Sequence, residues 1–207
     1  FDNLNIDLGA AWTTAFSATW EGGNKFPTLA FGNYVDRDDP NGPFGACDTN
    51  LVFRPNGETY QSPIKLDPSY CPLSLLFSDW GRNGRPDLRL SNDRHYYVTD
   101  GQEQLWAMEE TLRLYLQSDG WVEHQLWGMG IASRDITGDG LPEVMMSSMG
   151  DQRLQSRELQ TAGPVFKDAS FAKGTTAHRP FMGGDGRPST GWHIAFCDVQ
   201  NNGRDDI

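Results

Sequence analysis

The chain lacks long hydrophobic runs and is poor in basic residues. No apolar run in its 207 residues approaches the roughly 20 that a membrane-spanning helix needs, so we expect no transmembrane segment. Lys and Arg total 17 against 28 Asp and Glu, which gives a net charge of −11. Because binding a nucleic-acid backbone requires Lys and Arg to displace counterions, this balance argues against a nucleic-acid partner.

Motifs of several common enzyme classes are also absent. The chain contains no Gly-x-Ser-x-Gly, no phosphate-binding loop and no dinucleotide-binding fingerprint, so the sequence offers no support for those chemistries. It shows no signal peptide, but it opens inside strand-like sequence, so this absence excludes nothing. Helix-forming sequence is scarce, and only Glu103–Leu116 has enough good helix formers to suggest a helix.

Cysteine is rare, with three residues in the chain. Cys47 and Cys71 bracket one loop-rich excursion, and a disulfide between them would close a loop of roughly 25 residues and stabilise the fold by about 3 kcal/mol. The alternative is that they are two unrelated buried thiols. Cys197 lies in a predicted strand, and we expect it to be a small core residue.

One motif occurs three times: an Asp, four residues, a Gly, and an acid eight positions after the first Asp. Oxygen-bearing side chains at alternate positions, with a glycine for a sharp turn, are what a hard cation such as Ca²⁺ needs from a loop. The sequence therefore predicts metal-binding loops. The copies are Asp79-Trp-Gly-Arg-Asn-Gly-Arg-Pro-Asp87, Asp135-Ile-Thr-Gly-Asp-Gly-Leu-Pro-Glu143 and Asp198-Val-Gln-Asn-Asn-Gly-Arg-Asp-Asp206.

The copies recur at a nearly constant spacing, with first residues 56 and 63 positions apart (135 − 79 = 56 and 198 − 135 = 63). A degraded fourth copy, Trp20–Leu29, aligns with Asp79–Leu88 at an offset of 59. Trp20 and Thr28 stand at its first and last ligand positions, where the other copies have acids. We therefore expect this copy to form the same structural unit without binding an ion. Recurrence at such a period predicts repeated units, with motifs near residues 20–29, 79–88, 135–144 and 198–207.

The sequence around these loops is typical of strands. Apolar runs precede the loops at Leu73–Phe77, Trp127–Ala132 and Trp192–Cys197, and follow two of them at Leu88–Leu90 and Val144–Met146. An EF-hand places its bidentate acid at loop position twelve and is flanked by helices, whereas here the acid stands at position nine. We therefore expect metal-bearing turns between strands.

A period near 60 residues with several short strands in each unit suits one blade of a β-propeller. We thus expect an all-β fold in which residues 1–207 form a partial propeller of about three to four blades. Such a number does not close a ring, so the remaining blades would come from the same, longer polypeptide, which we favour, or from a second chain. Further strands are expected at Asp48–Tyr60, Tyr96–Trp106 and Leu112–Val122, and surface excursions at Asp36–Gly45 and Gly183–Gly191.

The motif pattern resembles the FG-GAP/VCBS repeats of integrin-α-type propellers, and four longer stretches resemble bacterial relatives of cartilage acidic protein. The resemblance covers nearly the whole chain. It implies a calcium-binding propeller of seven or eight blades, usually exported, in a family without an established catalytic activity. The stretches are FGNYVDRDDPNGPFGACDTN, LFSDWGRNGRPDLRLSNDRHYY, GMGIASRDITGDGLPEVMMSSMGD and AHRPFMGGDGRPSTGWHIAFCDVQNNGRDDI.

Carried over to this sequence, the resemblance implies three loops of unequal quality. The second has a full set of oxygen ligands, and the third has fewer charges, which predicts weaker binding. The first has Gly81 at its third position, so water must complete the shell or the site stays empty. The alternative for all three is an Asx-type turn without an ion. The expected ligands are Asp79, Asn83, Asp87 and the Arg85 carbonyl; Asp135, Thr137, Asp139, Glu143 and the Leu141 carbonyl; and Asp198, Gln200, Asn202, Asp206 and the Arg204 carbonyl.

Calcium is the favoured ion, with two or three expected in this chain. Zinc is disfavoured because the loops contain no Cys or His, and magnesium because it prefers few protein ligands and many waters. Part of the excess of acidic residues would then serve to coordinate calcium and would not indicate a basic binding partner. Together with the Cys47 and Cys71 pair, a calcium requirement favours a secreted, periplasmic or cell-surface protein.

Two further clusters are candidates for an active site. A histidine beside tyrosines could act as base and acid in β-elimination from an acidic sugar, and two arginines could grip a carboxylate. Aromatic packing in the first cluster and pairing with neighbouring acids in the second are the favoured interpretations. The candidates are His95 and Tyr96, and then His178, Arg179, Arg187 and His193.

The leading hypothesis is a non-catalytic, exported, calcium-binding propeller that presents a rigid surface to a protein or a glycan. The alternative is an enzyme on the same scaffold, such as a polysaccharide lyase or a sugar dehydratase, because a fold does not fix a function. A third hypothesis is a subunit of a larger extracellular assembly whose missing blades come from another chain.

Overall fold

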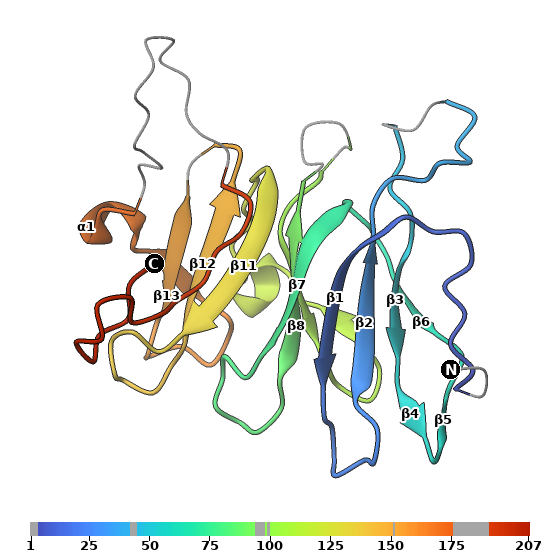
Figure 1. Cartoon of the computed structure of the whole chain (residues 1–207), viewed down its shortest axis with the longest axis horizontal. Helices are drawn as coiled ribbons and strands as arrows, with labels where there is room; N and C mark the ends of the chain where they lie inside the picture. The colour runs from blue at the N-terminus through green and yellow to red at the C-terminus, as the bar shows by residue number, and fades with distance from the viewer. Residues whose placement is uncertain (1–3, 42–44, 94–97, 99, 151, 176–190) are drawn as a thin grey trace.

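The computed structural model describes residues 4–41, 45–93, 98, 100–150, 152–175 and 191–207. Within these ranges the fold is all-β, which confirms the predicted class: three four-stranded antiparallel sheets lie side by side, with one two-stranded hairpin (Figure 1). Helical structure in the same ranges is limited to a 3₁₀ turn at Gln117–Asp119 and α1 (Ser170–Lys173). None of the helices described is long and apolar enough to cross a membrane.

Strand order in each sheet follows the chain, because consecutive strands form hairpins. The first sheet contains β1 (Thr13–Thr19), β2 (Thr28–Asn33), β3 (Asn50–Phe53) and β6 (Ile64–Leu66), with the hairpin β4 (Pro55–Asn56) and β5 (Thr59–Tyr60) inserted before β6. The second contains β7 (Pro72–Ser78), β8 (Asp87–Asn92), β9 (Gln104–Ala107) and β10 (Arg113–Leu114). The third contains β11 (Gly128–Arg134), β12 (Glu143–Ser148), β13 (Arg153–Arg157) and β14 (Phe166–Asp168).

The first two strands of each sheet pair in the same register. The last residue of the first strand pairs with the first residue of the second, nine positions later, and the expected loop lies between them. These pairs are Thr19 and Thr28, Ser78 and Asp87, and Arg134 and Glu143. The loops expected from the sequence therefore occupy one structural position in three sheets.

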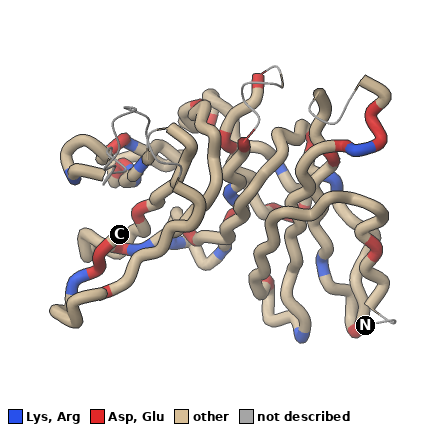
Figure 2. Tube along the Cα trace, turned by 45° about the horizontal axis from the view of Figure 1, so that its top comes forward, with Lys and Arg blue, Asp and Glu red and all other residues tan. Residues whose placement is uncertain are grey.

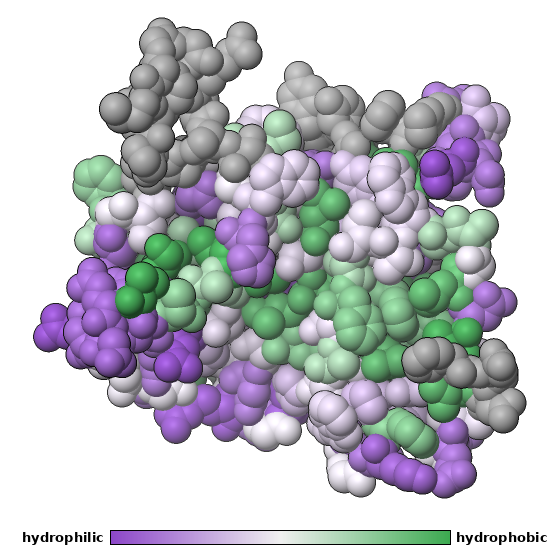
Figure 3. Space-filling model, in the orientation of Figure 1, coloured by the Kyte–Doolittle hydropathy of each residue, from purple (hydrophilic) through white to green (hydrophobic). Residues whose placement is uncertain are grey.

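A shift in strand register also recurs, at the start of the same first strands. The register shifts at Thr13/Ala15, Pro72/Ser74 and Gly128/Gly130, and these shifts are 59 and 56 positions apart, as the motifs are. Strand β7 contacts both β1 and β11, so the three first strands are neighbours (Figure 1). Hydrophobic residues form a band across the middle of the face that Figure 3 shows.

Two hydrophobic clusters join the sheets, one in each gap between neighbours. Because side chains alternate across a strand, Leu88 and Leu90 of β8 enter the cluster shared with the first sheet, while Arg89 between them turns toward Trp121 and Phe166. Strand β8 is buried along its whole length. The middle sheet is thus covered on both faces, which explains why its central strands, β8 and β9, are buried along their whole length.

The helix suggested for Glu103–Leu116 is wrong, since this segment forms β9 and β10. Leu105 and Ala107 of β9 face one hydrophobic cluster and Trp106 faces the other, an alternation that only a strand provides. Burial between two sheets therefore outweighs local helix propensity. The strands expected at Tyr96–Trp106 and Leu112–Val122 are shorter than predicted, and their described parts are limited to β9 and β10.

Several other boundaries differ from the prediction. The strand expected over Asp48–Tyr60 divides into β3, β4 and β5, because a turn at Gly57, with φ of 64°, reverses the chain. The strand expected at Trp192–Cys197 is reduced to one bridge between Cys197 and Asp206. Most of the Gly183–Gly191 excursion lies outside the described residues.

Cys197 is exposed and has a free thiol, so its expected place in the core is wrong. Its backbone forms the isolated bridge with Asp206, and its carbonyl also accepts the Val199 N–H at 3.1 Å. Cys197 thus belongs to none of the three four-stranded sheets described, and the single bridge leaves its side chain exposed.

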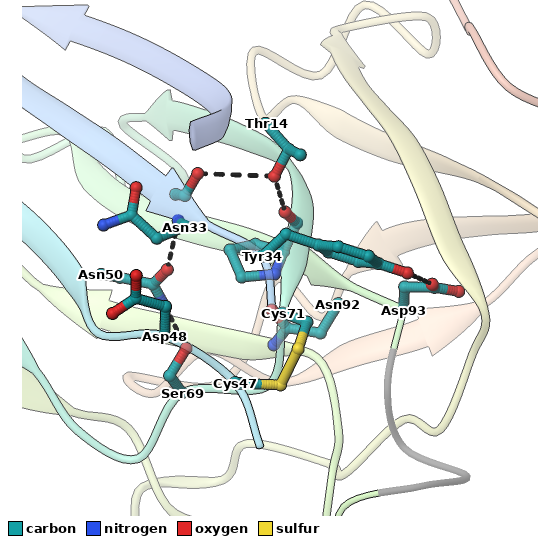
Figure 4. The surroundings of a disulfide bond; sticks show 12 residues. Thr14, Asn33, Tyr34, Cys47, Asp48, Asn50, Ser69, Cys71, Asn92 and Asp93 are labelled. Atoms are coloured by element: carbon teal, nitrogen blue, oxygen red, sulfur yellow. Dashed lines mark hydrogen bonds between the residues drawn. A yellow bond between two sulfur atoms is a disulfide. The ribbon is translucent and has the colours of Figure 1, made fainter. Parts of the chain in front are cut away.

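The disulfide expected between Cys47 and Cys71 is confirmed, at a sequence separation of 24. It joins the loop after β2 to the residue before β7, and so links the first and second sheets (Figure 4). Side-chain hydrogen bonds support it nearby: Asn50 accepts from the Asn33 backbone N–H at 2.9 Å and donates to Ser69 at 3.0 Å.

Replacing both disulfide cysteines with serine, C47S/C71S, should lower the free energy of unfolding by about 3 kcal/mol, because the unfolded chain regains the freedom of the closed loop. Urea denaturation followed by tryptophan fluorescence measures this change. C197S is the matched control and should leave the midpoint unchanged, since that thiol is exposed and unbridged. Equal midpoints for the double variant and the wild type would show that the bridge does not hold the two sheets.

Candidate metal-binding loops

The first two motif loops lie at one edge of the molecule, where the first strand of a sheet turns into the second, and the third is bounded by the single bridge between Cys197 and Asp206. Figure 1 shows the blue, green and yellow connections of the three sheets at the same lower edge, with the red C-terminal loop beside them. The degraded copy takes the same place, because β1 ends at Thr19 and β2 begins at Thr28. Charged segments mark the C-terminal loop in Figure 2.

The three loops share one internal hydrogen-bond pattern. In each, the first Asp accepts two backbone N–H groups with its two carboxylate oxygens, at 2.6–3.0 Å. The residue at position five accepts the N–H of position seven at 2.8–2.9 Å. Position six is glycine with φ of 78°, 83° and 81° at Gly84, Gly140 and Gly203, a conformation that L side chains rarely adopt. The N–H groups also lower the pKa of the Asp198 carboxyl below its usual value.

The second loop fits a calcium ion by the chemistry of its donors. Asp135, Asp139 and Glu143 supply carboxylates, and the Thr137 hydroxyl and Leu141 carbonyl complete an all-oxygen set. Glu143 is buried and accepts the Ile136 N–H at 2.9 Å, which fixes the far end of the loop. In the described part of the chain no three His, Cys, Asp or Glu side chains are gathered as a metal cluster. The expected set thus depends on the hydroxyl and the carbonyl as well as on acids.

The third loop repeats this arrangement with fewer charges. Asp206 accepts the Val199 N–H at 3.1 Å, as Glu143 accepts the equivalent N–H in the second loop. Asn202 donates to Gln200 at 3.3 Å, which places the two amide side chains of the expected set together. With two carboxylates in place of three, this loop should bind a cation more weakly than the second.

The first loop does not fit the ion, because its last acid is already fully engaged. Asp87 is 1% exposed. One carboxylate oxygen accepts Trp80 Nε1 at 2.7 Å and the Tyr115 hydroxyl at 2.9 Å, and the other accepts the Met108 N–H at 2.9 Å and Arg85 Nε at 3.3 Å. Burial, and then Asp87, raise the pKa of Tyr115 to about 12, so this hydroxyl remains a donor. With Gly81 also lacking a side-chain oxygen, we assign Asp87 a packing role.

Arginine side chains connect neighbouring loops. Arg82 of the first loop donates from Nη1 to the Asp139 carbonyl of the second at 3.4 Å, and a Cβ at Gly140 would come within 2.3 Å of that nitrogen. Arg134, at the end of β11, pairs with Asp205 of the third loop at 2.7 Å. The loop edge is therefore one connected surface rather than three separate turns.

Most of the candidate catalytic residues lie outside the described part of the chain: His95, Tyr96, His178, Arg179 and Arg187. His193 is described and exposed, and it lines a cavity of about 400 Å³ with Gln152 and Ile194. The acid and base that the lyase hypothesis requires, His95 and Tyr96, lie outside the described residues.

A buried polar cluster lies between the second and third sheets, and no sequence motif predicts it. Arg89 lies 5.0 Å from the ring centroids of both Trp121 and Phe166, and it donates to Gln155, which also contacts His124 Nε2 at 2.6 Å. Its members come from separate strands and a loop, so only the packing of sheets brings them together. No motif spacing in a single sequence marks such a cluster.

Burial shifts the titration of this cluster. It raises the pKa of Glu103 to about 8 and lowers that of Arg89 to about 10 and that of His124 to about 4. Glu103 accepts the Asn92 N–H at 2.8 Å. Glu103 lines a cavity of about 20 Å³, which is too small to hold a substrate. We interpret the cluster as packing between sheets.

No protein-family model matches this chain, and no curated protein matches it either.

Substituting D87N should lower the free energy of unfolding by about 3 kcal/mol, because the amide NH₂ meets buried donors and an acceptor is lost. The matched control is D79N, at the partly exposed first position of the same loop, where we expect about 1 kcal/mol. Chemical denaturation of both variants measures the difference. A larger effect at Asp79 than at Asp87 would contradict the packing role.

The Glu103 pKa predicts a pH dependence of stability. Between its ordinary value of 4.5 and about 8, folded Glu103 keeps a proton that the unfolded chain releases, so stability falls as pH rises through this window. His124, with a lowered pKa, acts in the opposite direction but only below its ordinary value of 6.5. From pH 6.5 to 8 the Glu103 effect should therefore dominate within this cluster.

Substituting E103Q should flatten the decline of melting temperature from pH 6.5 to 8, because glutamine resembles the protonated acid. Thermal melts by circular dichroism across this range measure it, with E123Q, at an exposed position, as the control. Parallel declines in the wild type and E103Q would mean that Glu103 does not titrate in this window.

Proposed function

We propose that this chain is part of an exported, calcium-binding β-propeller of the FG-GAP/VCBS type, which presents a rigid surface to a protein or glycan ligand. Support comes from the equivalent registers of the three sheets and from the adjacency of β1, β7 and β11. Propellers place the first strands of successive blades side by side around an axis. The resemblance of the long stretches to relatives of cartilage acidic protein points the same way.

The shared loop geometry is the observation that carries the proposal. Three loops of different composition each bring the N–H of the glycine at position six to the first Asp. Two of them lie at the same point of their sheets, and the third is bounded by the single bridge between Cys197 and Asp206, at the same nine-residue separation. Two of them retain a complete oxygen set, and these are the proposed calcium sites: the Asp135 loop and the Asp198 loop. In this account the ion stiffens the turn that sets the register of the first two strands.

Export is supported by the bond between Cys47 and Cys71, because disulfides persist in oxidising compartments. Extracellular calcium is also abundant enough for sites of modest affinity. The acid-rich composition then serves largely to supply ligands and to keep the surface soluble.

Calcium should raise the melting temperature and bind with two ions per chain, because only the second and third loops fit it. A ligand at about 100 times its dissociation constant stabilises the folded state by about 2.7 kcal/mol per site. Differential scanning calorimetry in CaCl₂ and in EGTA, with isothermal titration calorimetry for stoichiometry, measures both quantities. MgCl₂ serves as the ion control.

Single substitutions identify which loop is responsible for the calcium-dependent shift in melting temperature. D135N should abolish the stronger site and remove most of the calcium-dependent shift in melting temperature, whereas D79N should preserve both sites. An identical melting temperature in CaCl₂ and EGTA would contradict the proposal that calcium stabilises the fold. A third ion that is lost in D79N would instead show that the first loop binds metal.

A further inference from the structure

A groove of about 560 Å³ opens at the end of the sheets opposite the motif loops. The loops follow the ends of the first strands, whereas this groove lies where those strands begin. Trp12 and Trp127, which immediately precede β1 and β11, line it together with Trp192. It is therefore separate from the proposed calcium sites.

The groove is built from equivalent positions of the three sheets. Thr14, Leu73 and Met129 line it from the first strands, and they are 59 and 56 positions apart (73 − 14 = 59 and 129 − 73 = 56), which is the spacing of the register shifts.

The residues that follow the second strands contribute in the same way. Tyr34, Asp93 and Met149 come directly after β2, β8 and β12 and show the same two offsets. The groove thus lies where three structurally equivalent units converge. Convergence of units is where repeat architectures form their binding sites, because each unit supplies a side chain to one common surface.

Hydrogen bonds and ring contacts fix the groups around the groove. The Tyr34 hydroxyl donates to the Asp93 carboxylate, which joins the first sheet to the second (Figure 4). The Trp12 and Tyr34 rings meet edge to face with centroids 5.4 Å apart. Thr14 donates to the Pro72 carbonyl at 2.8 Å. Trp127 packs on Gly150, where an added Cβ would come within 3.1 Å of its ring. A preorganised groove loses little entropy on binding.

Among the described residues that line the groove, the exposed side chains are three indoles and Met149, and the one charged residue is Asp93. Arg37 lies over the Trp12 ring, 5.2 Å from its centroid. Trp12, Trp127 and Trp192 are 45%, 38% and 66% exposed, whereas Asp93 is 7% exposed and already accepts a hydrogen bond. A basic peptide would need an accessible carboxylate, and an acidic sugar would be repelled by a chain of net charge −11. Flat aromatic faces beside a few fixed polar groups suit the C–H faces of neutral pyranose rings.

We infer that this groove is a binding site for a neutral glycan, recognised by stacking on Trp12, Trp127 and Trp192. The inference deepens the proposed function and rests on it for the fixed arrangement of the sheets. Calcium acts at the opposite end of the strands and does not contact the sugar.

The test uses the purified protein in CaCl₂ with three neutral pentasaccharides: cellopentaose, maltopentaose and chitopentaose. Pentalysine and tetragalacturonate are the charged probes. Binding is followed by isothermal titration calorimetry and by tryptophan fluorescence. We expect at least one neutral pentasaccharide to bind, and W127A and W192A each to weaken it by about tenfold. W20A is the matched control, since Trp20 is 65% exposed but lies in the loop between β1 and β2 at the other end.

The melting temperature of each variant separates loss of binding from loss of folding. This control matters more for Trp127, which is 38% exposed and packs on Gly150, than for Trp192, which is 66% exposed. W127F and W192F, which retain an aromatic face, should recover part of the affinity. The inference is overturned if no neutral pentasaccharide binds, if pentalysine or tetragalacturonate binds more tightly, or if both alanine variants bind as the wild type does.

The two proposals fail separately. If calcium raises the melting temperature but no neutral pentasaccharide binds, only the proposed glycan site is wrong. If glycan binding depends on the tryptophans while calcium has no effect on melting, the groove stands and the calcium role in the proposed function is wrong.

Discussion

The nine-residue reversal between the first two strands of each sheet is the constraint on which the arrangement of this protein depends. In the Asp79 and Asp135 loops, one carboxylate helps to hold this reversal by accepting two backbone N–H groups. That reversal sets the register of the first two strands, and the register decides which residues enter the gaps between sheets. A slip of one residue would turn Leu88 and Leu90 out of their cluster and bring Arg89 into it.

The same turn accommodates very different chemistry in its three copies. In the Asp135 loop, acids and a hydroxyl remain available as oxygen donors for a cation. In the Asp79 loop the final acid instead receives Trp80, Tyr115 and the Met108 N–H, so protein groups occupy the lone pairs that an ion would use. The degraded loop at 20–28 has neither the first nor the last acid of the motif, and it still connects its two strands in the same register. A unit of this fold therefore keeps its geometry through hydrogen bonds alone, and a bound ion would add stability to a turn that already exists.

The sequence predicted the all-β class, the loop positions and the disulfide, because those features depend on local spacing: a motif period, an apolar run, a pair of cysteines around one loop. It failed at Glu103–Leu116 and Cys197, where the outcome depends on which sheet lies alongside. It also could not reveal that Asp87 is engaged, since Trp80 lies in the same loop but Tyr115 and Met108 belong to other segments. The groove of Trp12 and Trp127 was hidden for the same reason, although their separation is the sum of the two repeat offsets.

The most direct test of the central claim is a crystal structure of the protein grown in CaCl₂, with anomalous scattering recorded to locate the ions. The account predicts calcium at the Asp135 and Asp198 loops, none at the Asp79 loop, and β1, β7 and β11 arranged around one axis. An empty Asp135 loop, an ion bound by Asp87, or sheets that share no common axis would contradict it.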